Sequence, residues 1–177
     1  MDELFDELRN EFRRNSGIIA FTRIGLKQFS DSLSWTVSAE NPDPSISLGR
    51  MSPTAPNARA DARWHKSEIE SSSDPLGWLD KVTTQSWIAL TAARWEGYYR
   101  PKFAKIAGEE NHNKVTSAVM ADIHHMRNDI MHNKGIASKN HTGRNQVLKR
   151  FSIGDEIILV EEDVWLLSDN LNIEIVH

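Results

Sequence analysis

Apolar residues recur at helical spacing over most of the chain. In residues 2–14 the apolar positions fall on one helical face, and they are Leu4, Phe5, Leu8 and Phe12. Residues 18–39 contain a second stripe of the same period, made of Ile19, Leu26, Phe29, Leu33 and Val37. Gly17 lies between the two segments and weakens a helix without forbidding it. The pattern therefore predicts either two helices or one bent helix.

Two longer helices are predicted further along the chain. The Asp74-Pro75 step is typical of a helix start, and apolar positions follow it at helical spacing toward Pro101. Residues 113–133 contain another stripe, and Gly135 stands where a helix-terminating glycine is expected. Both segments are long enough to form the main helices of a bundle.

The remaining segments complete a mainly α prediction. Residues 41–74 contain four of the six prolines and many serines, which predicts a long loop or a partly disordered insertion. Residues 150–160 predict a short hairpin or strand pair, and the acidic run from Glu161 favours the start of a last helix. We expect residues 1–177 to form a single domain, a helical bundle with a small C-terminal β element.

The composition excludes several functional classes. None of the 177 residues is cysteine, which excludes a disulfide framework, a zinc finger and a thiol nucleophile. No apolar run approaches the roughly 20 residues of a membrane helix, and the acidic N-terminus lacks the pattern of a signal peptide. We therefore expect a cytoplasmic protein without a membrane partner. The net charge of -4 argues against broad adhesion to nucleic acid, although a local basic site remains compatible with it.

The densest usable chemistry lies in residues 127–132, Arg-Asn-Asp-Ile-Met-His, near the end of the predicted helix over residues 113–133. A guanidinium can neutralise a phosphate, and an amide can orient it. An imidazole exchanges a proton near neutral pH, so it can act as a general base or acid. Arg127, Asn128 and His132 are therefore the candidate catalytic residues of a phosphodiester-cleaving site.

Helical geometry directs this motif away from the core. At about 100° per residue, the apolar stripe lies almost opposite Asn128, and His132 follows one turn later on the same side. That stripe comprises Val115, Val119, Ile123, Met126 and Ile130. The outward neighbours of the motif mix apolar and polar types, and they include Met120, Ala121, His124 and Met131. Such a face suits a second copy of the helix, so we expect a homodimer in which two motifs share one cleft.

A cationic stretch follows the motif directly. Residues 130–154 contain neither Asp nor Glu. Within this stretch, Lys134, Lys139 and Arg144 are the candidate RNA-binding residues, because a local cationic patch can attract a polyanion. The same residues fit a solvated loop without a binding role equally well.

A metal site is the competing interpretation of the motif helix. Carboxylates and imidazoles recur there at helical spacing, at Asp122, His125, Asp129 and His132. No other predicted helix provides a matching carboxylate–histidine set. We therefore predict no metal and no cofactor, and we expect the two aspartates to be solvated or to form interface salt bridges.

The pattern of residues 127–132 resembles the R-x4-6-H signature of the HEPN superfamily (higher eukaryotes and prokaryotes nucleotide-binding domain). In that family a polar residue commonly follows the Arg, as Asn128 does here. Trp95-Glu96 in the preceding helix resembles the W-E pair of several bacterial HEPN families. The resemblance covers roughly residues 75–150. It implies a helical bundle that is usually dimeric and, in many members, metal-independent RNA cleavage with attack by the ribose 2′-hydroxyl and a cyclic phosphate product.

The resemblance also assigns expected roles. Arg127 and His132 would be catalytic, Asn128 would support them, and Glu96 would position Arg127. The family is prominent in toxin–antitoxin and phage-defence systems, which implies an antitoxin or another defence protein as a possible partner beside RNA. Some HEPN domains are catalytically silent. A non-catalytic module for RNA binding, protein binding or dimerisation is therefore the alternative to an endoribonuclease.

Overall fold

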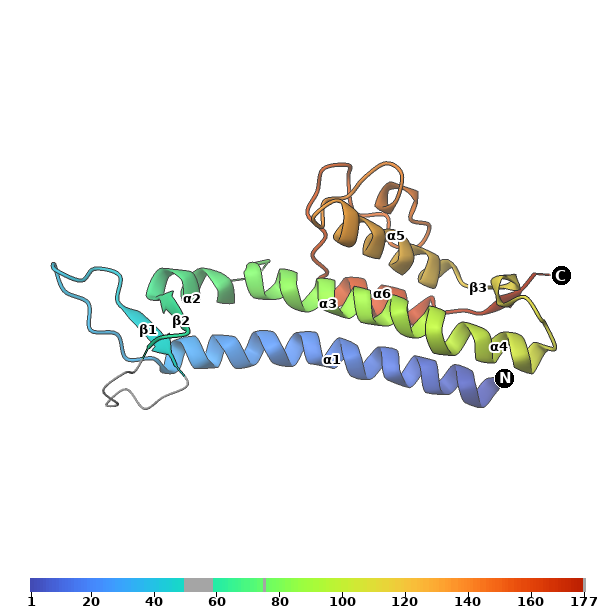
Figure 1. Cartoon of the computed structure of the whole chain (residues 1–177), viewed down its shortest axis with the longest axis horizontal. Coiled ribbons are helices and arrows are strands. Elements are labelled where there is room, and N and C mark those ends of the chain that lie inside the picture. Colours follow the sequence, from blue (N-terminus) through green and yellow to red (C-terminus); the bar gives the residue numbers. More distant parts are fainter. Residues whose placement is uncertain (50–58, 75, 177) are drawn as a thin grey trace.

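Two long helical rods lie side by side and form the body of the molecule (Figure 1). The fold is described from a computed structural model for residues 1–49, 59–74 and 76–176. The first rod is the single helix α1 (Asp2–Ser32). The second rod joins three helical segments, which are α3 (Trp78–Arg94), a π-helical turn (Trp95–Tyr99) and α4 (Arg100–Ala107).

Helices α5 (Ala118–His132) and α6 (Glu161–Asp169) complete the bundle. Helix α5 packs against α3 on the side away from α1, and α6 packs against α1 (Figure 1). Two short 3-10 turns lie at His112–Lys114 and Thr142–Arg144. The mainly α architecture expected from the apolar periodicity is confirmed.

The N-terminal third forms one helix rather than two. The buried positions of α1 lie along one face, which continues through the glycine without a break. They include Leu4, Leu8, Phe12 and Ile19. The ring of Phe12 meets that of Trp87 on α3 edge to face, with centroids 5.0 Å apart. Burial against α3 therefore outweighs the weak helical preference of Gly17.

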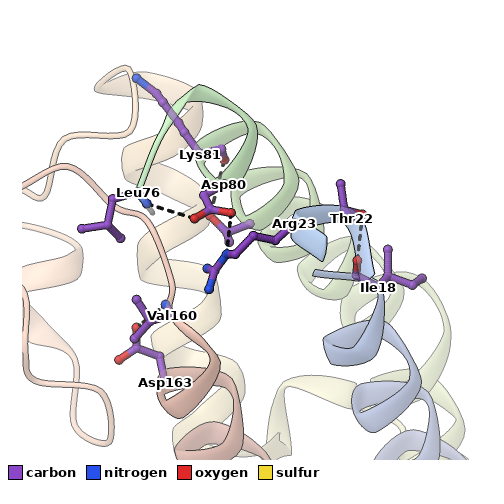
Figure 2. Close-up of polar contacts among 9 residues, drawn as sticks. Ile18, Thr22, Arg23, Leu76, Asp80, Lys81, Val160 and Asp163 are labelled. Atoms are coloured by element: carbon purple, nitrogen blue, oxygen red, sulfur yellow. Dashed lines mark hydrogen bonds and ion pairs between the residues drawn. The ribbon is translucent and has the colours of Figure 1, made fainter. Parts of the chain in front are cut away.

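A partly buried ion pair joins α1 to the start of α3 (Figure 2). The Asp80 carboxylate accepts hydrogen bonds from Arg23 Nε and from the backbone N–H of Leu76, both at 3.0 Å. Asp80 is only 3% exposed. The expected helix start was therefore placed too early, because α3 begins at Trp78 after the turn that Asp80 stabilises. Pro75 lies outside the described residues.

Regular structure occupies much of residues 41–74, where the composition predicts a loop. Strands β1 (Ser45–Leu48) and β2 (Ala62–His65) form an antiparallel hairpin, and α2 (Lys66–Ser73) follows. The first turn of α2 is capped, since Glu68 accepts a hydrogen bond from the His65 backbone N–H at 2.7 Å. Residues 50–58, which include two of the prolines behind the loop prediction, lie outside the described residues.

A small β element forms at the C-terminal end, although its strands are not the ones predicted from the sequence. Strand β3 (Val115–Thr116) pairs antiparallel with β4 (Glu174–Ile175). The hairpin expected within residues 150–160 does not form there. Residues 154–157 pair instead with the segment after α5, because Ile157 N–H donates to the Gly135 carbonyl at 2.8 Å. Within the ranges that the structure describes, no helix combines the length and apolar character needed to cross a bilayer.

Candidate functional site

The motif residues lie on the last two turns of α5 and remain accessible. Arg127 and Asn128 are half-buried, and His132 is exposed. Arg127 Nη1 donates a hydrogen bond to Asn128 Oδ1 at 3.1 Å, so the guanidinium and the amide are held together. Asn128 and His132 are one turn apart, about 40° around the helix axis. The geometry therefore places an oriented guanidinium and an exposed imidazole at one helix end.

The core-facing side of α5 follows the predicted stripe, with one correction. Val119, Ile123 and Met126 are each 0% exposed. Met120 was expected on the outer face, but it is only 2% exposed, because the outer edge of α5 near its start is covered by other elements. Met131 is 58% exposed on the face that would meet a second copy. That face is therefore less apolar than the sequence indicates.

Two aspartates of α5 anchor the loop that follows the helix. Asp122 accepts hydrogen bonds from three successive backbone N–H groups, those of Gln146, Val147 and Leu148, at 2.7 to 2.8 Å. Asp122 is 0% exposed, so the expectation of a solvated or interface role is wrong. Inward-facing carboxylates that satisfy backbone N–H groups need no metal and no counter-ion.

Asp129 binds an earlier part of the same loop. Its Oδ2 accepts hydrogen bonds from the backbone N–H groups of Ser138 at 2.8 Å and Thr142 at 3.0 Å, and Asp129 is 0% exposed. The carboxylates of the competing metal interpretation therefore bind the loop, Asp122 through both of its oxygens and Asp129 through Oδ2. In the described part of the chain, no group of three or more potential ligands is arranged to hold a metal ion.

The anchored loop presents the predicted cationic residues to solvent. Lys134, Lys139 and Arg144 are exposed, on a segment fixed by Asp122 and Asp129 from the same helix as the motif. The cations are consequently held next to α5 rather than on a freely moving tail. This arrangement supports an electrostatic role for the three side chains.

Asp129 makes the anchoring of the loop sensitive to acid. Burial alone would raise the pKa of Asp129, but hydrogen bonds from Ser138 and Thr142 outweigh it and lower the pKa below the ordinary value of 3.8 for an aspartate. A carboxylate whose pKa is lower in the folded state than in the unfolded state stabilises the fold at pH values above its unfolded-state pKa. That stabilisation is lost as the pH falls through the folded-state pKa. We expect the Ser138 and Thr142 amides to lose hydrogen-exchange protection as the pH falls through this lowered pKa, below 3.8, and to lose it at neutral pH in Asp129→Asn. Unchanged protection in that variant would contradict this role.

Glu96 does not contact Arg127 in the described structure. Its carboxylate pairs with Arg100, whose Nη1 lies 3.1 Å from Oε2. The expectation that Glu96 positions Arg127 therefore has no contact to support it here. Trp95 is 4% exposed and belongs to the core, as its aromatic character indicates.

The anchoring role of the two aspartates was not predicted from the sequence, although a signal for it was present. Asp122 and Asp129 are seven residues apart, so they share one side of the helix, directly beside the apolar stripe. An acid-free loop follows. Carboxylates at the edge of a buried face, next to a segment rich in small and polar residues, are suitable acceptors for its backbone N–H groups.

Comparison of the chain with models of known families, with curated proteins and with solved structures gives no match. Its function is therefore inferred from the residues and their geometry.

Proposed function

We propose that this chain is a metal-independent endoribonuclease whose site lies at the C-terminal end of α5. One observation supports the proposal most strongly. The end of α5 presents an exposed imidazole and a hydrogen-bonded guanidinium–amide pair beside an anchored loop with three exposed cations. Cleavage of a phosphodiester without a metal requires a positive charge that stabilises the phosphate and a group that can transfer a proton.

In the proposed reaction, His132 removes the proton from a ribose 2′-hydroxyl. The 2′-oxygen then attacks the adjacent phosphorus, and the bond from phosphorus to the 5′-oxygen breaks. The products are a 2′,3′-cyclic phosphate and a 5′-hydroxyl, which receives a proton from the solvent or from a protonated imidazole. Arg127 stabilises the charge that develops on the phosphate oxygens, and Asn128 holds the guanidinium in place through its hydrogen bond.

The three loop cations would bind neighbouring phosphates. Lys134, Lys139 and Arg144 are exposed, so they can approach the backbone of a single strand. Pairing of two α5 outer faces in a homodimer would bring two sets of motif residues into one cleft. Together with the HEPN resemblance, this chemistry extends the proposal to a toxin or phage-defence effector that acts with a partner protein.

The test is incubation of the purified protein with single-stranded RNA in EDTA, followed by analysis of the product ends. We expect cleavage products with 2′,3′-cyclic phosphate and 5′-hydroxyl ends. Binding without cleavage would contradict the nuclease and support the non-catalytic RNA-binding module. Cleavage that stops in EDTA and returns with a divalent ion would instead support a metal-dependent reaction.

A further inference from the structure

An open cavity lies on the same face of α5 as the motif. It has a volume of about 240 Å³, and its lining includes Glu96, Thr116, Ala121, His124 and His125. At about 100° per residue, His124, Asn128 and His132 follow one another at successive turns of one stripe. At about 1.5 Å per residue, His132 lies roughly 12 Å further along the helix than His124. A single strand bound at His132 can therefore extend along α5 into the cavity.

The polar groups of this cavity do not form a phosphate site. Arg100 is its guanidinium, and all three of its nitrogens already donate hydrogen bonds. Nε donates to the Val115 carbonyl at 3.0 Å, Nη2 to the Asn113 carbonyl at 3.2 Å, and Nη1 to Glu96 at 3.1 Å. The Glu96 carboxylate and the Arg100 guanidinium form an ion pair without net charge, and the Glu96 side chain remains 41% exposed. The cavity therefore offers a phosphate no uncommitted guanidinium nitrogen, whereas the exposed carboxylate oxygens can accept hydrogen bonds from a neutral group with N–H donors.

His125 adds an uncharged hydrogen-bonding group. Burial lowers its pKa, and the nearby Arg144 guanidinium acts in the same direction despite the neighbouring Asn145 amide. Its Nδ1 is buried and has no hydrogen-bond partner among the described residues. The imidazole therefore adds no charge to the lining of the cavity, which suits a neutral heterocycle.

The backbone at Glu96 is itself unusual. Residues Trp95–Tyr99 form a π-helical turn inside the long second rod, a feature that occurs frequently at functional sites. The turn buries Trp95 and Tyr99 while Glu96 remains exposed beside the cavity. The core aromatics therefore hold the carboxylate at a defined position opposite the α5 histidines.

We infer that this cavity is a nucleobase subsite for the RNA strand bound by α5, and that Glu96 selects a base with an exocyclic amino group. The inference depends on the proposed RNA-binding function. Cytosine and uracil are the matched pair, because they have the same size and differ at one edge. The cytosine N4 amino group donates to a carboxylate, whereas the uracil O4 oxygen would face it as a second acceptor.

The test measures binding of C10 and U10 RNA in EDTA, using fluorescence anisotropy and a His132→Ala background that prevents cleavage. We expect C10 to bind roughly tenfold more tightly than U10. In Glu96→Gln the preference should fall to less than about threefold, because an amide can both donate and accept. Asp31→Asn is the matched control, since it breaks a similar i,i+4 ion pair, with Lys27, on the surface of α1. Thermal melts of both variants establish that they are folded.

The outcomes separate this subsite from the nuclease proposal. If the wild-type protein cleaves RNA but the His132→Ala protein binds C10 and U10 with equal affinity, the subsite is overturned and the nuclease proposal stands. A C10 preference that depends on Glu96, in a protein that cleaves nothing, would support the subsite and overturn the nuclease. Equal affinities, an unchanged preference in Glu96→Gln, or no binding of either RNA would each overturn the subsite.

Discussion

Replacement of His132 by alanine is expected to lower the rate of RNA cleavage by about 100-fold to 10,000-fold, the range typical for loss of a general base. The side chain is exposed and has no hydrogen bond among the described contacts of the chain. Its removal should therefore leave the free energy of unfolding within about 0.5 kcal/mol of the wild-type value. The measurement is a single-turnover cleavage assay in EDTA, combined with a urea denaturation curve.

Two further substitutions make this result specific. His112→Ala removes another exposed imidazole, one that lies outside α5, and cleavage should be unaffected. Arg127→Lys keeps the positive charge but loses the planar fork, so its rate should lie between those of wild type and Arg127→Ala. Full activity in His132→Ala would exclude His132 as the general base. Equal losses in His132→Ala and His112→Ala would indicate general damage to the protein rather than loss of a general base.

Replacement of Asp122 by alanine is expected to lower the free energy of unfolding by about 3 to 5 kcal/mol. The substitution leaves three consecutive backbone N–H groups without their carboxylate acceptor, and Leu148 among them is only 2% exposed. The buried Leu148 N–H cannot recover its hydrogen bond from solvent, so its full desolvation cost remains, whereas the part-buried N–H groups of Gln146 and Val147 recover theirs only in part. Equilibrium denaturation in urea measures the change, and hydrogen exchange at residues 146–148 shows whether the loop is released.

Asp155→Ala is the matched control for Asp122→Ala. The Asp155 carboxylate also accepts a backbone hydrogen bond, from Ser152 N–H at 2.7 Å, but in an exposed turn. Water can replace that acceptor, so we expect a loss of less than about 1 kcal/mol. Similar losses for the two variants would contradict a special anchoring role for Asp122. Because the loop contains the three exposed cations, Asp122→Ala should also weaken RNA binding, whereas Asp155→Ala should not.

The helices were largely predictable because their signals are local. The stripe on α5 and its end before Gly135 follow from residue spacing, and the structure confirms that Val119, Ile123 and Met126 face the core. The accessibility of His132 followed from the same helical projection. Helix starts were less accurate, since the turn before α3 is held by Asp80, which also pairs with Arg23, 57 residues away.

The candidate site was only partly predictable for a related reason. Arg127, Asn128 and His132 could be selected as a group because they lie on adjacent turns of one helix. The pairing of Glu96 with Arg100 rather than Arg127 could not be predicted, because the choice between the two arginines depends on how two helices pack. The pairing of residues 154–157 with the segment after α5 likewise depends on a distant strand-like partner rather than on its own turn.

Periodicity and side-chain chemistry were sufficient for the helical class, the core face of α5 and the identity of its polar motif, since each depends on residues a few positions apart. Three-dimensional packing alone decided that α1 is continuous, that Asp122 and Asp129 bind the loop, and that Glu96 meets the α5 histidines across a cavity. Those features join residues distant in sequence, and their partners are selected by burial and by the need of buried N–H groups for acceptors.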